Sequence, residues 1–192
     1  MKALSGLSPN EKIYVLFNKM DKIDENNPFI SKRKEDLESK KGDFKINYYQ
    51  TSIWEISLYK AFSDILSSII KDVQDVKKIL EEYSKACEAD EVAIFDKNSL
   101  LVISSFNNKN YKDEERFEKI CYSMKKFESN YKLISNKINE FTIKNKVNTI
   151  YFDEFTDSSY IMVALSNKNI SLELIKLNME IIKKEFLAIM EK

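Results

Sequence analysis

The chain has 192 residues and a balanced charge, with 31 Lys and Arg residues against 31 Asp and Glu residues and no histidine. Net charge therefore gives no reason to expect nucleic acid as a partner. The lack of histidine removes the side chain that most often transfers protons near neutral pH. No apolar run is long enough to span a bilayer, so we expect no direct membrane insertion.

The first strand-like segment, Ile13–Phe17, runs directly into Asn18-Lys19-Met20-Asp21. Guanine presents two adjacent donors, N1–H and the exocyclic amine, and one carboxylate can accept from both. We expect Asp21 to be this carboxylate, Asn18 to donate toward the other edge of the base and brace the loop, and the Lys19 stem to lie along the flat face of the ring. Adenine lacks the donor pair and would leave the carboxylate unpaired, which gives strong discrimination.

Chance is the alternative explanation for this motif. The dipeptide Asn-Lys occurs five times in the chain, and only the copy at Asn18 is followed by an aspartate two residues after the lysine. One match in a chain so rich in lysine, asparagine and aspartate is weak evidence by itself. Its weight therefore depends on the structural context that surrounds it.

The context is a helix, a strand and a second loop. Pro28–Lys41 is polar and is followed by Gly42, which is typical of a solvated helix and its stop signal. Phe44–Thr51 alternates and is rich in aromatic residues, as strands are. In the turn that follows, we expect backbone N–H groups at Ser52 and Ile53 to reach guanine O6. This order is the second half of a doubly wound α/β domain, in which ligands bind at the carboxyl ends of strands.

The phosphate-binding half of a GTPase is missing from these residues. A P-loop needs Gly-x-x-x-x-Gly-Lys-Ser/Thr, whereas the two glycines, Gly6 and Gly42, lie in unrelated settings. We therefore expect GTP or GDP to make base contacts only, with no catalytic residue, no metal ligand and no hydrolysis by this chain alone. Mg²⁺ is expected only together with an upstream half that carries a P-loop.

Apolar residues recur every three or four positions from Leu58 to Cys87, with no glycine or proline between them, which predicts a long amphipathic helical stretch. A domain boundary is expected inside it, near Lys71-Asp72, although no residue marks it. Cys87 and Cys121 both fall at apolar helical positions. We expect both to be buried thiols in a reducing compartment rather than a disulfide or a metal pair.

The rest of the chain predicts a sheet with helices packed on it. The five expected strands are Glu91–Phe95, Leu100–Phe106, Ile138–Lys144, Asn148–Phe155 and Tyr160–Ser166. One helix, from Phe117 to Ile134, separates the second strand from the third, and Leu172–Met190 forms the last helix. This order matches a roadblock or longin-type module with a five-stranded antiparallel sheet. The edges of such a sheet are commonly completed by a second copy or a related chain.

Several segments occur in the order expected of a Rag GTPase, namely NKMD, TSIWEISLYKAFSDIL, EADEVAIFDKNSLLVIS, RFEKI and FTDSSYIMVALS. From about Lys12 to its end the chain resembles this family, and most of all the RagA/RagB type. The blocks at Thr51–Phe62 and Glu88–Ser104 are the specific ones. The resemblance implies that residues 1–71 are the guanine-base-recognition part of a P-loop GTPase domain and that residues 72–192 are a roadblock dimerisation domain.

The resemblance also implies a function. Rag GTPases pair an A/B-type with a C/D-type subunit through their roadblock domains and report amino-acid sufficiency to the TOR kinase complex. They are cytoplasmic, and a scaffold complex of roadblock proteins holds them on the lysosomal or vacuolar membrane. Members of the A/B type often carry histidine where this chain has Asn18, so its base loop is closer to that of an ordinary Ras-like protein.

Two functions remain open. The chain is either the later part of a guanine-nucleotide-binding signalling protein, or a short paralogue that acts as a roadblock interaction module without nucleotide binding or GTPase activity. A roadblock-like protein unrelated to TOR signalling is a third, minor alternative. Because two strands rarely form a stable unit alone, we expect residues 1–56 to be poorly protected from amide exchange in isolation, while residues 73–192 fold.

Overall fold

The computed structural model describes residues 12–24, 27–70, 72–109, 113, 115–131, 139–166 and 169–190. The chain divides into two compact units, Met1–Ile65 and Leu66–Lys192. None of the described helices combines the length and the apolar character that crossing a bilayer requires.

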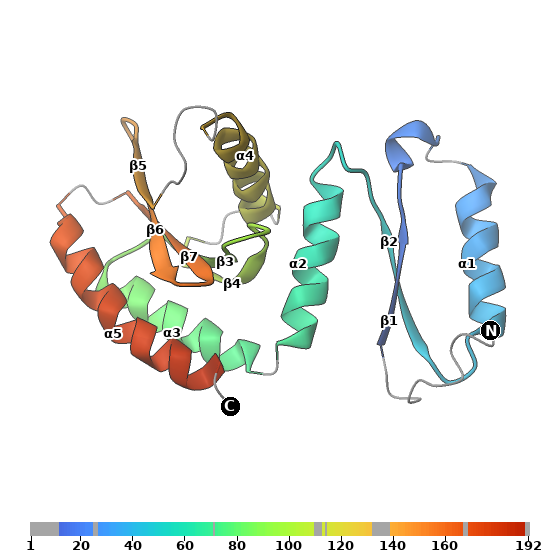
Figure 1. Cartoon of the computed structure of the whole chain (residues 1–192), viewed down its shortest axis with the longest axis horizontal. Helices are drawn as coiled ribbons and strands as arrows, with labels where there is room; N and C mark the ends of the chain where they lie inside the picture. Colours follow the sequence, from blue (N-terminus) through green and yellow to red (C-terminus); the bar gives the residue numbers. More distant parts are fainter. Residues whose placement is uncertain are drawn as a thin grey trace. The chain divides into compact units, whose positions relative to one another are not determined.

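A pair of parallel strands forms the centre of the first unit (Figure 1). The elements in chain order are β1 (Lys12–Phe17), the 3-10 turn η2 (Met20–Lys22), α1 (Pro28–Lys40), β2 (Lys45–Gln50) and the first part of α2 (Ser57–Ile69). Parallel strands need a crossover connection, and α1 supplies it. The strand, helix and strand predicted for this region are confirmed within one or two residues at each end.

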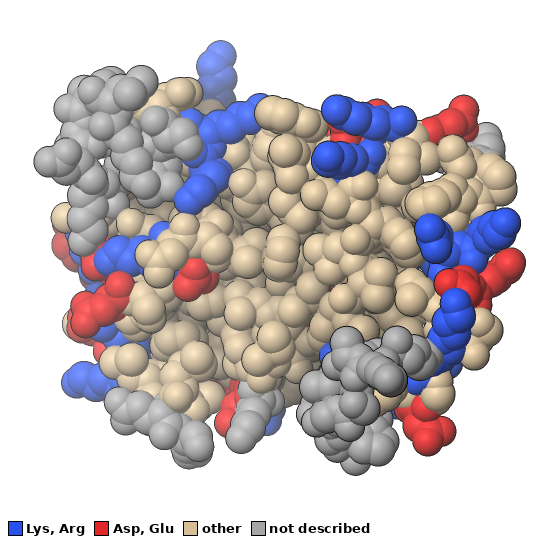
Figure 2. All heavy atoms as spheres, turned by 45° about the vertical axis from the view of Figure 1, so that its right-hand side comes forward, with Lys and Arg blue, Asp and Glu red and all other residues tan. Residues whose placement is uncertain are grey.

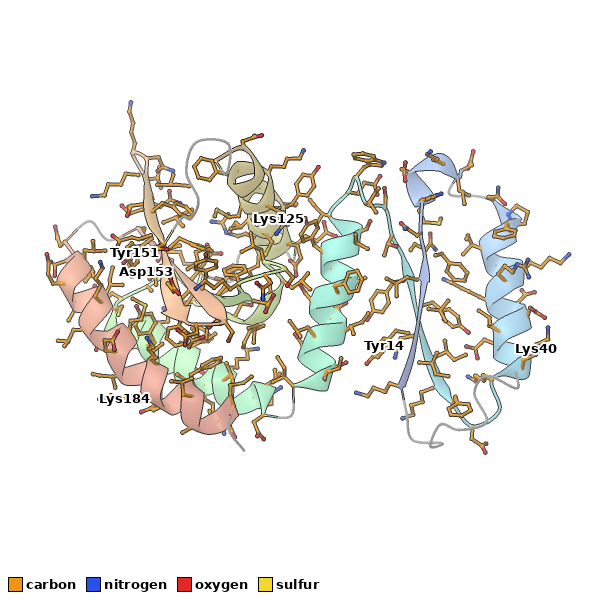
Figure 3. The ribbon with its side chains drawn as sticks, viewed as in Figure 1. Tyr14, Lys40, Lys125, Tyr151, Asp153 and Lys184 are labelled. Atoms are coloured by element: carbon orange, nitrogen blue, oxygen red, sulfur yellow. The ribbon has the colours of Figure 1, made fainter. Side chains whose placement is uncertain are left out.

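Aromatic side chains hold this strand pair on both faces. Toward α1, the rings of Phe17 and Tyr48 stack with their centroids 6.1 Å apart, and Lys34 of α1 lies 5.8 Å from the Tyr48 ring centre. On the opposite face, the ring centroids of Tyr14 (labelled in Figure 3) and Tyr49 lie 6.5 Å apart. Alternation of side chains along each strand places these two pairs on opposite faces.

The second unit contains a five-stranded antiparallel sheet. Its elements are α3 (Val73–Ala86), β3 (Glu91–Asp96), β4 (Val102–Asn107), α4 (Arg116–Tyr131), β5 (Glu140–Lys144), β6 (Thr149–Thr156), β7 (Ser159–Leu165) and α5 (Leu172–Met190). The strand order is β4-β3-β7-β6-β5, so β4 and β5 are the edges. The predicted order of helices and strands is confirmed. Two predicted boundary residues, Ile134 and Ile138, lie outside the described residues.

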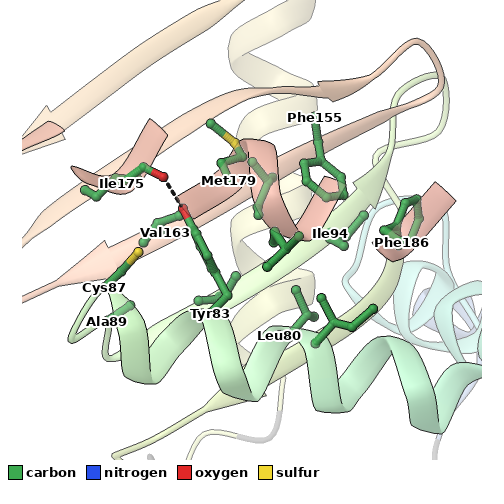
Figure 4. Close-up of a cluster of buried hydrophobic side chains, with 14 of the residues drawn as sticks. Leu80, Tyr83, Cys87, Ala89, Ile94, Phe155, Val163, Ile175, Met179 and Phe186 are labelled. Atoms are coloured by element: carbon green, nitrogen blue, oxygen red, sulfur yellow. Dashed lines mark hydrogen bonds between the residues drawn. The ribbon is translucent and has the colours of Figure 1, made fainter. Parts of the chain in front are cut away.

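Helices α3 and α5 pack on one face of this sheet and enclose its core (Figure 4). The helical core residues are Val76, Ile79, Leu80, Tyr83, Cys87, Ile175, Met179, Ile182 and Phe186. Their three- and four-residue spacing gives each helix one apolar face. The Tyr83 hydroxyl donates to the Ile175 carbonyl at 3.1 Å, which ties α3 to α5 and satisfies a buried polar group.

Helix α4 lies on the other face of the sheet, where aromatic rings form a connected series. The Phe152 ring lies 5.7 Å from Phe95, 4.9 Å from Phe141 and 5.2 Å from Tyr160. Phe127 of α4 meets Phe141 at 6.1 Å. These contacts connect α4 to the strands across this face.

A buried ion pair ties the start of α4 to the sheet. Arg116 Nε lies 2.6 and 2.8 Å from the two carboxylate oxygens of Glu91, the first residue of β3. The Glu91 side chain is 1% exposed and the Arg116 side chain 29%. A carboxylate this deeply buried needs a charged partner, and Arg116 provides one.

The long helical stretch predicted from Leu58 to Cys87 is two helices. Helix α2 ends at Ile69 and α3 begins at Val73, with the Asp72 carbonyl accepting from the Asp75 and Val76 N–H groups at 3.0 and 3.1 Å. No glycine or proline marks the break, and the apolar periodicity is much the same on both sides of it. The sequence therefore does not show where one helix ends and the next begins.

Both cysteines are buried and free, as the sequence predicts. Burial is the main cause that raises the pKa of the Cys87 thiol and of the Cys121 thiol above the ordinary value. Figure 2 shows Lys and Arg side chains lying close to Asp and Glu side chains at several places on the surface that it draws.

Candidate functional site

The first predicted loop leaves β1 through a sharp turn. Lys19 adopts a left-handed conformation, with φ 66° and ψ 33°, and its N–H donates to Asn18 Oδ1 at 2.8 Å. A left-handed backbone costs a residue other than glycine about 1 kcal/mol, and a short polar neighbour that bonds the turn compensates for part of this. The turn brings Asp21 back toward the end of β2. Asn18 thus braces the loop, and its amide NH₂ group donates to none of the described residues.

The second predicted loop is joined to the first through the backbone. The Thr51 N–H donates to the Phe17 carbonyl at 2.8 Å, which extends the strand ladder by one bond. The Met20 N–H then donates to the Thr51 carbonyl at 3.1 Å. Thr51 and Ser52 are both fully buried, so their positions are fixed by the packing around them.

A side-chain hydrogen bond joins the two loops at the predicted site. Ser52 Oγ donates to Asp21 Oδ1 at 2.7 Å, and the Trp54 N–H donates to the same hydroxyl oxygen at 3.2 Å. Among the described residues, Ser52 is the single partner of the Asp21 carboxylate, so Oδ2 is left to accept from a ligand. Asp21 is itself exposed, whereas Ser52 is buried.

One predicted donor is already engaged. The Ser52 N–H donates to Ser57 Oγ at 3.0 Å, at the first residue of α2. The N–H of Ile53 makes no hydrogen bond to any residue in the described ranges. Of the two backbone donors expected at guanine O6, Ile53 is therefore the one that remains available. Sequence reasoning missed Ser57, although a hydroxyl residue at the start of a predicted helix is a common backbone acceptor.

The structure thus brings all five predicted residues to the carboxyl ends of β1 and β2, as expected for parallel strands. Asn18, Lys19, Asp21 and Ile53 are exposed around the buried Ser52. The arrangement offers one fixed carboxylate, one amide, one backbone donor and one aliphatic stem. A flat heterocycle with two adjacent donors and one acceptor matches this set.

Two hollows are found outside these loops. Among the described residues no cluster of three or more His, Cys, Asp or Glu side chains could hold a metal ion. Two hollows lie in the second unit. One, of about 400 Å³, lies between the β5–β6 hairpin and the start of α5, and the other, of about 250 Å³, lies between α4 and the strands β5 to β7.

Comparison with known proteins identifies the family. The model of the Gtr1/RagA G protein conserved region matches residues 1–124. Ras-related GTP-binding protein A of Dictyostelium discoideum is 33% identical over 188 residues, which cover 97% of this chain and 62% of that protein. Ras-related GTP-binding protein B of Rattus norvegicus is 31% identical over 97% of this chain and 50% of that protein. The chain therefore spans only about half to three-fifths of these relatives.

A solved structure matches the fold. Myxococcus xanthus MglB is similar with a TM-score of 0.51 and 20% identity, over 63% of this chain and 91% of that chain. The five-stranded antiparallel sheet with its helices has the roadblock or longin-like fold, and the chain belongs to the Gtr1/RagA family of G proteins.

Proposed function

We propose that the chain is part of a guanine-nucleotide-binding signalling protein of the Rag type and that its first unit recognises the guanine base. The observation that carries the proposal is the 2.7 Å bond from Ser52 Oγ to Asp21 Oδ1. It fixes one oxygen of an exposed carboxylate at the edge where ligands of parallel sheets bind. The carboxylate can then accept from the N1–H and N2–H donors of guanine, one through each oxygen, because Oδ1 keeps a second lone pair beside its bond to Ser52.

The other site residues have separate roles in this proposal. The Asn18 amide donates toward the imidazole edge of the base, and the Lys19 methylene stem covers one flat face. The Ile53 N–H donates to O6, because the Ser52 N–H is held by Ser57. These residues fit the base of GTP or GDP. They offer nothing to the phosphates, so Mg²⁺ binding and hydrolysis belong to a P-loop segment that these residues do not include.

Partners and location are proposed from family membership. A C/D-type Rag subunit would pair with residues 72–192, the proposed roadblock dimerisation domain, while residues 1–71 form the base-recognition part of the GTPase domain. A scaffold of roadblock proteins would hold the cytoplasmic complex on the lysosomal or vacuolar membrane. There it would report amino-acid sufficiency to the TOR kinase complex.

A second candidate function, a roadblock interaction module, is favoured by the open side of the second unit. Five strands span roughly 24 Å at about 4.8 Å per strand, and one helix covers only about 10 Å of that width. Two helices, α3 and α5, cover the other face, whereas α4 is the one described helix that lies on this face. Phe127 and Ile143 are 49% and 51% exposed there, beside the apolar hollow of about 250 Å³. β5 is also an edge strand, so a partner's strand and helix can extend both layers.

The test is base discrimination. Saturation-transfer NMR with the 192-residue chain should detect guanosine and not adenosine, and Asp21→Ala should abolish the guanosine signal. Ser52→Ala, which removes the anchor of the carboxylate, should weaken binding by about five- to tenfold. Equal signals from the two nucleosides would exclude the base site. If the chain binds neither nucleoside but forms a complex with a partner chain, and Ile143→Asp weakens that complex, the chain acts as the interaction module.

A further inference from the structure

We propose that the hollow of about 400 Å³ in the second unit is a binding site for a small aliphatic carboxylate. The hollow lies between the β5–β6 hairpin and the start of α5, on the sheet face that α3 and α5 cover. Its volume is within the range of about 300–1,000 Å³ that small-molecule sites occupy. The inference is independent of the guanine site, which lies in the first unit.

The lining of the hollow has an aliphatic part and a polar part. Strand β7, the loop after it and the first turn of α5 supply the aliphatic residues, which are Leu165, Ile170, Leu172 and Ile175. The β5–β6 hairpin supplies the polar residues. The described lining includes one charged side chain, that of Lys144, and no carboxylate. A ligand with a hydrocarbon part and an anionic end matches this combination.

Lys144 is a cation without a countercharge. It makes no ion pair with any described residue, whereas Lys176 of α5 is neutralised by Glu140 at 2.8 Å. Side chains alternate along a strand, so Glu140 and Lys144 lie on the same face of β5, at its two ends. An anion is therefore attracted to the Lys144 end of this strand and repelled from the Glu140 end.

Two neutral side chains beside Lys144 can complete a carboxylate site. Asn145 Oδ1 accepts from the Val147 and Asn148 N–H groups, each at 2.8 Å, which holds this side chain at the turn. Its NH₂ group donates to none of the described residues. Thr149 is the register partner of Lys144, and its side chain also lines the hollow. A cation with neutral donors next to it satisfies several lone pairs of one carboxylate.

The rest of the lining suits the hydrocarbon part of the ligand. The Tyr151 hydroxyl already donates to Asp153 Oδ2 (both residues are labelled in Figure 3), so it is engaged within the protein. Leu165 and Ile175 are buried core residues, which makes their wall of the hollow rigid. Leu172 is 37% exposed, and an aliphatic chain packed on it removes apolar surface from water.

The experiment titrates the 192-residue chain with octanoate and follows backbone amide chemical shifts by NMR. We expect saturable shifts at residues 142–151 and 170–176. Octanamide has the same chain without the charge and should bind about tenfold more weakly. Lys144→Gln should weaken octanoate binding by about five- to tenfold and leave octanamide binding unchanged. Lys146→Gln is the matched control, because Lys146 is an exposed lysine of the same hairpin that does not line the hollow.

A second variant, Leu172→Glu, tests the aliphatic part. It places a negative charge at the hollow, and an acidic residue in the first turn of a helix is favourable, so the variant should fold. We expect this variant to lose octanoate binding.

Three results would overturn the inference. The first is the absence of saturable shifts. The second is octanoate affinity that neither Lys144→Gln nor Leu172→Glu changes. The third is a set of shifts at the same residues that follows protein concentration instead of octanoate, because a second copy of the chain would then occupy the hollow.

Discussion

The two units differ in what holds them together. In the second, a sheet and the helices α3 and α5 enclose a continuous apolar core. In the described part of the first, Ile30 and Ala61 are the buried apolar residues, and every β1 residue from Ile13 to Phe17 is only half-buried. Two strands with aromatic contacts bury too little surface to be stable on that basis alone.

The candidate binding site and the main apolar core therefore lie in different units. The candidate site lies in the first unit, in loops fixed by a small set of hydrogen bonds between Phe17, Met20, Asp21, Thr51 and Ser52. The second unit contains the residues that make folding favourable. Binding residues are commonly found on loops, and ligand-binding loops belong to the less stable parts of a structure.

The largest expected effect on stability comes from removing a large side chain from the core of the second unit. Phe155→Ala removes a fully buried ring whose centroid lies 5.2 Å from that of Phe186. The free energy of unfolding should fall by about 3–5 kcal/mol, measured by urea denaturation followed by circular dichroism. Phe127→Ala, at a half-exposed ring, is the control and should cost much less. Equal losses would show that burial does not distinguish these positions.

Amide exchange tests the comparison directly. In the intact chain, backbone amides of β1 and β2 should exchange at least about a hundredfold faster than those of β3 and β7, because the first unit opens without unfolding the second. Mass spectrometry of peptides from residues 12–50 and 91–165 gives the two rates. Uniform slow exchange across both segments would contradict the comparison.

Breaking the buried ion pair should also act on the second unit. Arg116→Ala leaves the Glu91 carboxylate buried without its charge partner, and we expect a loss of about 3 kcal/mol in unfolding free energy. The double variant Glu91→Met with Arg116→Met removes both charges and should recover most of that loss. If the double variant is no more stable than the single one, the pair contributes through packing rather than charge.

Alkaline pH should destabilise the second unit. Burial raises the pKa of Cys121, and that of Tyr83 as well, so the native state retains protons that the unfolded chain has lost. The contribution of these groups to stability is constant below about pH 8.5, the unfolded thiol pKa, and falls above it; for Cys121 alone the loss is about 2 kcal/mol by pH 10. Urea midpoints at pH 7.5 and pH 10 measure this. Cys121→Ala should make the fall with pH shallower, with Tyr83 and Cys87 still contributing, and an unchanged slope would contradict the assignment.

The element order could be predicted from the sequence because its patterns are strong. Alternating aromatic and apolar residues identified β1, β2 and the five strands of the sheet, and apolar spacing identified α5 from Leu172 to Met190. The meeting of Asp21 and Ser52 at one edge also followed from the parallel topology. The strand order and the Glu91–Arg116 pair could not be predicted, because they depend on residues far apart in the chain.

Local details of the site could not be predicted from the sequence for a different reason. The left-handed conformation of Lys19 and the bond from the Ser52 N–H to Ser57 depend on how the two loops pack together. A lysine does not require a left-handed backbone, and a serine does not require this hydrogen bond. The break between Ile69 and Val73 is similar. Apolar periodicity continues on both sides, so tertiary packing decides where the helix ends.

The most direct test of the base site is a change of specificity at Asp21. Xanthine carries a carbonyl where guanine carries its exocyclic amine, and an asparagine amide can donate to that carbonyl while its oxygen accepts from N1–H. Saturation-transfer NMR with Asp21→Asn should show xanthosine bound and guanosine lost, the reverse of the unmodified chain. Unchanged preference for guanosine in the variant would contradict base recognition by Asp21.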